Sequence, residues 1–166
     1  MKNLIAFPIL VLVVILQSSV VSRIALLSGY ADLMLLILAA WALQEQVRTA
    51  WHWAALGGIL VGFISGLSWF IPLIGYFLTV ALAQLFQRRV WQAPLLAMFA
   101  VIFLGTLCMH VLSLVALSLS GNPLPLGEAL GLVTMPSLLL NFLFAAPIYV
   151  LMKDLAGWLY PLEVIE

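Results

Sequence analysis

The sequence predicts an all-α protein: one integral membrane domain over residues 1–166, a polytopic membrane protein with six transmembrane helices. Composition is the first reason, because 66% of the 166 residues are apolar or aromatic and only 7% are charged. A typical soluble domain is about 45–50% apolar and about 25% charged, so this chain lacks the polar side chains that cover a surface in water. The other two reasons are the lengths of its apolar runs and the places of its few charges.

The charge balance excludes further classes of protein. Six Lys and Arg residues balance six Asp and Glu residues, so the chain cannot form the basic patch that nucleic acid requires. Disorder requires low hydrophobicity and high charge, and this composition is the reverse. Cys108 is the single cysteine, which excludes a disulfide within the chain. Lipid is therefore the expected solvent for most of the chain.

Each apolar run is judged by whether it reaches the roughly 20 residues that a membrane-crossing helix needs. The first run is too long for a signal peptide and has no cleavage site after it, so we expect it to remain as an anchor. The charge-free run 54–86 is roughly 50 Å long as a helix, enough for two short crossings with a break near Pro72. Leu27-Ser28-Gly29 is expected to form a tight turn between the first two spans. The expected spans are about 4–22, 27–43, 54–69, 72–86, 93–119 and 132–152.

Six crossings place both termini on one side of the membrane, and the positive-inside rule selects the cytoplasm. The basic residues on that side are then Lys2, Arg48, Arg88, Arg89 and Lys153, whereas Arg23 alone lies outside. The tryptophans fall at expected span ends, where indole rings favour the headgroup level. They are Trp41, Trp51, Trp53, Trp69, Trp91 and Trp158. We therefore expect a multi-pass protein with both termini in the cytoplasm.

Arg23 and Asp32 flank the first hairpin turn, so their side chains are candidates for a charge pair. A pair would fix the hairpin or meet a partner near the outer surface, because ionisable groups near lipid are costly. In the alternative interpretation both residues are simply interfacial. Arg23 then extends toward water, and Asp32 sits at the positive end of its helix.

Gly58, Gly62 and Gly66 recur at every fourth residue and are expected to share one helix face. A face of small residues lets another helix approach closely in lipid, where packing drives association. The second helix belongs either to this chain or to a partner protein, and the spacing does not choose between them.

Gln17, His110 and Asn141 are polar residues within or near expected spans. They are candidates for a polar pocket that holds a lipid headgroup or a solute. The alternative is that they satisfy one another by hydrogen bonds between helices, as most such residues do.

The sequence carries none of the patterns that intramembrane chemistry requires. It shows no His, Cys and carboxylate cluster with metal-ligand spacing and no phosphate-binding loop or HExxH motif. No carboxylate pair is placed for acid–base work. We therefore expect no catalytic residue, no metal and no cofactor, and hence a protein that is not an enzyme.

Two segments carry a family pattern. One runs from Leu16-Gln17-Ser18-Ser19 through Arg23 to Gly29-Tyr30-Ala31-Asp32-Leu33, and the other is the glycine-rich third span followed by Pro72-Leu73-Ile74-Gly75-Tyr76. Both resemble segments of the rod shape-determining protein MreD family. Length, six spans and cytoplasmic ends agree with that family. Two positions depart from it, because Ala31 stands where the family usually has Pro and the third span lacks the typical Asp near Ser65 and Gly66.

The resemblance implies a non-enzymatic scaffold subunit of the bacterial cell-elongation (rod) complex in the inner membrane, which helps to organise peptidoglycan synthesis and cell shape. Its implied partners are an MreC-like periplasmic single-span protein, RodZ, MreB, RodA with its transpeptidase, and membrane lipid. The implied fold is similar to the substrate-binding subunit of energy-coupling-factor transporters. The alternative function is therefore a substrate-binding membrane subunit of a small-solute, vitamin-type transporter, and an outward-facing polar cavity of solute size would favour it.

Overall fold

The computed structural model describes residues 5–66, 68–89 and 93–161, and these residues form helices without any extended strand. The all-α expectation is therefore confirmed for the described part of the chain. The elements are α1 (Ala6–Ser19), the 3₁₀ turn η2 (Val21–Arg23), α2 (Leu33–Ala42), α3 (Ala50–Ile64), α4 (Phe70–Arg89), α5 (Pro94–Leu119), α6 (Leu126–Glu128), the π-helical segment η3 (Ala129–Thr134) and α7 (Met135–Leu159).

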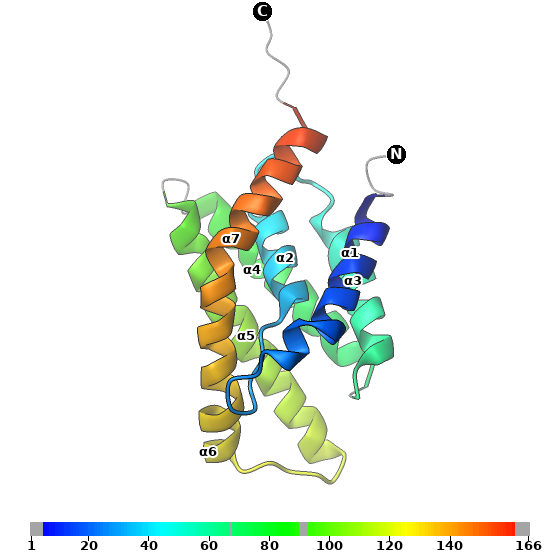
Figure 1. Ribbon diagram of the computed structural model, residues 1–166, viewed down its shortest axis with the longest axis vertical. Coiled ribbons are helices and arrows are strands. Elements are labelled where there is room, and N and C mark those ends of the chain that lie inside the picture. Colours follow the sequence, from blue (N-terminus) through cyan, green and yellow to red (C-terminus); the bar gives the residue numbers. More distant parts are fainter. Residues whose placement is uncertain (1–4, 67, 90–92, 162–166) are drawn as a thin grey trace, which may run out of the picture.

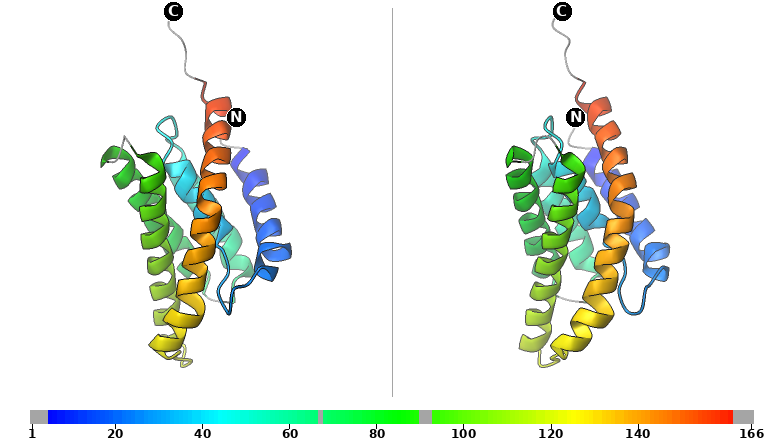
Figure 2. Two further views of the ribbon diagram at one scale, coloured as in Figure 1. Left: turned by 60° about the vertical axis from the view of Figure 1, so that its left-hand side comes forward. Right: turned by 90° about the vertical axis from the view of Figure 1, so that its left-hand side faces the viewer.

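Helix α2 occupies the middle of the bundle (Figures 1 and 2). It contacts α1, α3, α4, α5 and α7, and every residue from Met34 to Ala42 is at most 7% exposed. All ten of its residues are apolar or aromatic, so the neighbouring helices can enclose it on all sides.

The helices alternate in direction along the bundle. The start of α1, the 43–49 loop and the end of α7 lie at one end, which we call the termini end (Figure 1). The connection from α5 to α6 lies at the opposite end, which we call the tip end. There the hairpin made by α5, α6 and η3 projects beyond α1–α4 (Figures 1 and 2).

Four helical segments are long and apolar enough to cross a membrane: Ala6–Arg23, Phe70–Arg88, Pro94–Leu119 and Leu126–Leu159. This is consistent with a membrane protein. Helices α2 and α3 have only 10 and 15 residues. Since a helix rises about 1.5 Å per residue, α2 is about 15 Å long, half the thickness of a hydrocarbon core. Helix α2 begins at Leu33, whereas the expected second span begins at residue 27.

Residues between η2 and α2 bond to other parts of the chain instead of forming a helix. Leu26 and Gly29 exchange two backbone hydrogen bonds of 2.9 Å, which confirms the tight turn, and Leu27 has a φ of 54°. The Ser28 N–H donates to the carbonyl of Leu132 at 3.0 Å. Gly29 lies so close to α7 that a Cβ there would stand 2.6 Å from the Val133 carbonyl oxygen. The segment is therefore docked against η3 and the start of α7.

The three spaced glycines do not form a single packing face. A Cβ on Gly58 would lie 2.6 Å from the Cα of Leu73, and one on Gly62 would lie 2.7 Å from the Trp69 carbonyl oxygen. Both glycines thus pack against α4 and the turn before it, so their partner belongs to this chain. Gly66 has no atom within 4 Å of its Cβ position. Its inclusion in the face was wrong, because α3 ends at Ile64 and the chain turns back toward α4.

The tryptophans divide into two groups. Trp51, Trp69 and Trp158 are exposed, as interfacial residues are, whereas Trp41 and Trp53 are each 1% exposed. These two rings stack in the core with centroids 4.4 Å apart. They therefore contact protein rather than an outer surface, and Trp91 lies outside the described residues.

The substitution Gly62→Leu is expected to destabilise the fold by about 1–3 kcal/mol, because the added atoms would overlap the backbone at Trp69. Gly66→Leu is the matched control, since its Cβ meets nothing within 4 Å. Thermal unfolding of both purified variants in detergent would measure the difference. Equal unfolding temperatures would contradict the close packing of α3 on α4.

Candidate functional site

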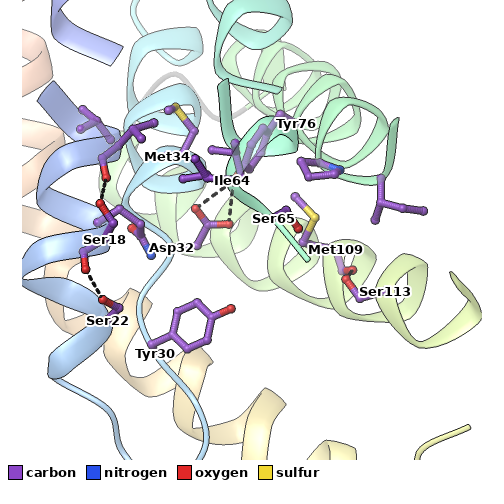
Figure 3. A pocket seen from close by; sticks show the side chains of 16 residues that line it. Ser18, Ser22, Tyr30, Asp32, Met34, Ile64, Ser65, Tyr76, Met109 and Ser113 are labelled. Carbon is purple, nitrogen blue, oxygen red and sulfur yellow. Dashed lines mark hydrogen bonds between the residues drawn. The ribbon is translucent and has the colours of Figure 1, made fainter. Parts of the chain in front are cut away.

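A cavity of about 310 Å³ opens beside the start of α2 (Figure 3). Ligand sites in proteins range over about 300–1,000 Å³, so this cavity has room for a small solute. Its walls come from α1, the segment before α2, and helices α3, α4 and α5. Half of its lining residues are polar: Gln17, Ser18, Ser22, Tyr30, Asp32, Ser65, Tyr76 and Ser113.

Asp32 is the central polar residue of the cavity. Its side chain is half-buried, and one carboxylate oxygen accepts the Leu35 N–H at 2.9 Å, which caps the N-terminus of α2. Aspartate is among the residues preferred at this position, and its charge is favourable at the positive end of a helix. The Tyr76 hydroxyl donates to the same carboxylate at 3.2 Å. In Figure 3 the carboxylate lies between the rings of Tyr76 and Tyr30.

Two side chains hold the backbone that carries Asp32. Gln17 Nε2 donates to the Ala31 carbonyl at 2.8 Å, and its Oε1 accepts the Leu33 N–H at 2.8 Å. The Asp32 N–H donates to Asn141 Oδ1 at 2.8 Å. Three consecutive residues are thereby tied to α1 on one side and to α7 on the other.

Asn141 also connects α7 to α5, because its Nδ2 donates to Thr106 Oγ1 at 2.9 Å. Its side chain is fully buried. For Gln17 and Asn141 the structure therefore shows the interhelical hydrogen bonds that were one of the two open interpretations. A pocket is present as well, because Gln17 borders the 310 Å³ cavity.

His110 borders a second cavity of about 100 Å³, together with Asn141 and Asp32. The His110 Nδ1 lies 2.9 Å from Thr134 Oγ1, and that hydroxyl donates to the Ala129 carbonyl at 3.1 Å. The Thr134 hydroxyl thus links the His110 ring to the backbone of η3. The residues Gln17, His110 and Asn141 thus divide between two cavities that share Asp32 as a wall.

The expected charge pair is not formed, since no ion pair joins Arg23 to Asp32 in the part of the chain that the structure describes. Arg23 is exposed at the end of η2, whereas the Asp32 carboxylate points inward to Tyr76. The docked segment between them separates the two side chains. Tyr76 was missed in the sequence because only the packing of α4 against α2 brings it to Asp32.

Replacing Asn141 with Leu is expected to destabilise the protein by about 1–3 kcal/mol. The Asp32 N–H and the Thr106 hydroxyl would lose their hydrogen-bond partner. A buried polar group without a partner lowers the free energy of unfolding by this amount. The same substitution at the exposed loop residue Asn122 is the control. Thermal unfolding in detergent would measure both variants, and an Asn141 variant as stable as the control would disprove the tether.

Among the described residues no group of three or more His, Cys, Asp and Glu side chains is placed to hold a metal ion. The features of the site are therefore the two cavities and the hydrogen-bonded segment around Asp32. Comparison of the chain with protein-family models, with curated proteins and with solved structures finds no match.

Proposed function

We propose that the chain is a non-enzymatic scaffold subunit of the bacterial cell-elongation complex in the inner membrane. It crosses the bilayer six times with both termini in the cytoplasm, in a fold similar to that of vitamin-transporter binding subunits. It holds an MreC-like single-span partner and, through it, helps to organise peptidoglycan synthesis. The resemblance of the first hairpin and of the third span to the MreD family supports this proposal.

The arrangement of basic residues supports the six crossings. Helix alternation brings Arg48, Arg88 and Lys153 to the termini end, while Arg23 follows α1 on the side toward the tip end (Figure 1). The positive-inside rule then assigns the termini end to the cytoplasm. The short helix α2 fits this arrangement because protein shields it on all sides.

The projecting tip is the observation on which the docking function depends. Helix α5 has 26 residues and starts soon after Arg88. Its length of about 39 Å exceeds a hydrocarbon core of about 30 Å, so its far end extends about 9 Å beyond the core. Only a tilt of about 40°, the upper limit for membrane helices, would accommodate it.

The tip nevertheless carries apolar side chains. Leu119 is 85% exposed and Leu126 is 70% exposed, with Leu124 beside them in the connecting loop. Leucines exposed beyond the hydrocarbon core indicate a surface that another protein covers. A single-span protein with a periplasmic domain has the chemistry to fit, because it presents protein directly above the outer membrane surface.

Cysteine labelling would test the orientation. In a Cys108→Ala background, Asn122→Cys at the tip is expected to react with a membrane-impermeant maleimide on spheroplasts. Glu45→Cys in the 43–49 loop is expected to react only after the membrane is permeabilised. The reverse pattern would overturn the proposed orientation, and labelling of both from outside would overturn the three crossings proposed between residues 45 and 122.

Co-purification would test the docking function. With the double variant Leu119→Ala/Leu126→Ala, the amount of MreC-like protein that co-purifies is expected to fall at least about ten-fold. The reason is that losing a central contact of an interface weakens the binding free energy by more than about 1 kcal/mol. Leu96→Ala/Leu143→Ala is the matched control, because these leucines are 65% and 68% exposed but lie away from the tip. Equal recovery with both double variants would refute docking at the tip.

The 310 Å³ cavity favours a second candidate function, a small-solute binding subunit of a transporter. Its polar lining includes Ser22 and Ser65, which follow α1 and α3 on the side toward the tip end. With the termini in the cytoplasm, the cavity faces the outer half of the membrane. Binding of a solute there, and its loss when the cavity is filled, would support this function beside docking.

A further inference from the structure

The hydroxyl groups around Asp32 leave the cavity rich in hydrogen-bond acceptors. Ser18 donates to the Val14 carbonyl at 2.7 Å, Ser22 to the Ser18 carbonyl at 2.7 Å, and Ser113 to the Met109 carbonyl at 2.9 Å. Each of these hydroxyl hydrogens is donated to the backbone carbonyl four residues earlier, whereas the oxygen lone pairs remain available. At these three serines a ligand would meet hydrogen-bond acceptors and would have to supply the donors.

The same cavity carries a negative charge without a positive partner. Asp32 accepts from two neutral donors, the Leu35 N–H and the Tyr76 hydroxyl. No Lys, Arg or His is among the described residues that line the 310 Å³ cavity. His110, which borders the smaller cavity, directs its Nδ1 to Thr134. A carboxylate away from water is costly unless a charge of opposite sign compensates it.

Aromatic rings flank the carboxylate. Tyr76 lies on one side of Asp32 and Tyr30 on the other (Figure 3), and both border the cavity. Tyr76 meets the carboxylate through its hydroxyl, whereas Tyr30 is exposed and its ring can attract a cation through the ring quadrupole. Valine, isoleucine, methionine and proline side chains form the remaining walls, so the space beside the charge suits an apolar body.

We propose that this cavity binds an organic cation: a primary ammonium group held by Asp32, with an apolar body between Tyr30, Tyr76 and the apolar walls. A free amine and the ethanolamine headgroup of a phospholipid share this chemistry. The inference rests on the second candidate function, that the cavity is a ligand site. It is independent of docking at the tip, which lies on other residues.

The test uses the full chain in nanodiscs of phosphatidylcholine and phosphatidylglycerol, with three probes of one shape and different charge. They are phenethylamine, 2-phenylethanol and 3-phenylpropionate, measured by calorimetry. Phenethylamine is expected to bind at least about ten-fold more tightly than the neutral alcohol, and the anion is expected not to bind. Removing one member of a close charge pair in a desolvated site weakens binding by at least this factor.

Variants identify the group that holds the cation. Asp32→Asn keeps a residue that caps helices well but removes the charge, and it is expected to lose phenethylamine binding by at least about ten-fold. Glu45→Gln removes one acidic charge from the distant 43–49 loop and is expected to bind as the natural chain does. Ser113→Phe fills the cavity without touching the tether around Asp32, and it is expected to abolish binding even where Asp32→Asn fails to fold.

The outcomes separate the inference from the function on which it rests. If 2-phenylethanol binds as tightly as phenethylamine, or if folded Asp32→Asn binds phenethylamine as the natural chain does, the cavity is not specific for a cation. It would still be a ligand site. Binding of none of the three probes would overturn both. Weaker phenethylamine binding after phosphatidylethanolamine is added to the nanodisc identifies the lipid headgroup as the source of the ammonium, and unchanged binding identifies a free amine.

Discussion

The tether that joins the backbone of Ala31, Asp32 and Leu33 to Gln17 and Asn141 is the interaction on which the arrangement depends. It decides where α2 begins and directs the Asp32 carboxylate toward Tyr76. In an apolar environment each unpaired backbone group is costly, so the non-helical entry to α2 exists only because these side chains satisfy it. The fold and the candidate site are therefore built by the same few hydrogen bonds.

The sequence predicted the helical class because composition alone determines which solvent the chain requires. It also identified Gln17, Asp32 and Asn141, since polar residues in apolar runs are rare enough to single out. It did not predict the partners of these residues, because Tyr76 and Thr106 reach the tether only through the packing of α4 and α5. The prediction from the glycine spacing was correct only in part. Gly58 and Gly62 pack closely against neighbouring backbone, but periodicity cannot show that α3 ends before Gly66.

The two proposed activities occupy different places on the molecule. The apolar tip of the α5–α6 hairpin offers a surface to another protein, whereas the cavity beside α2 offers a carboxylate, hydroxyl oxygens and aromatic rings to a small molecule. The two places have a common structural cause. Helices α1, α2 and α3 are short and do not reach as far toward the tip end as α5 does. Their early end exposes one side of the projecting hairpin and leaves the space beside Asp32 unfilled (Figures 1 and 3).

The separation between Asp32 and Asn141 along the chain has a consequence for biosynthesis. The two residues are 109 positions apart, so the ribosome must make most of the protein before the Asp32 N–H acquires its partner. At about 5–20 residues per second, this interval lasts about 5–20 s. During that time the Asp32 N–H, just before the short second helix, lacks the side chain that will accept its hydrogen bond. The second helix completes its fold only when the last helix enters the membrane beside it.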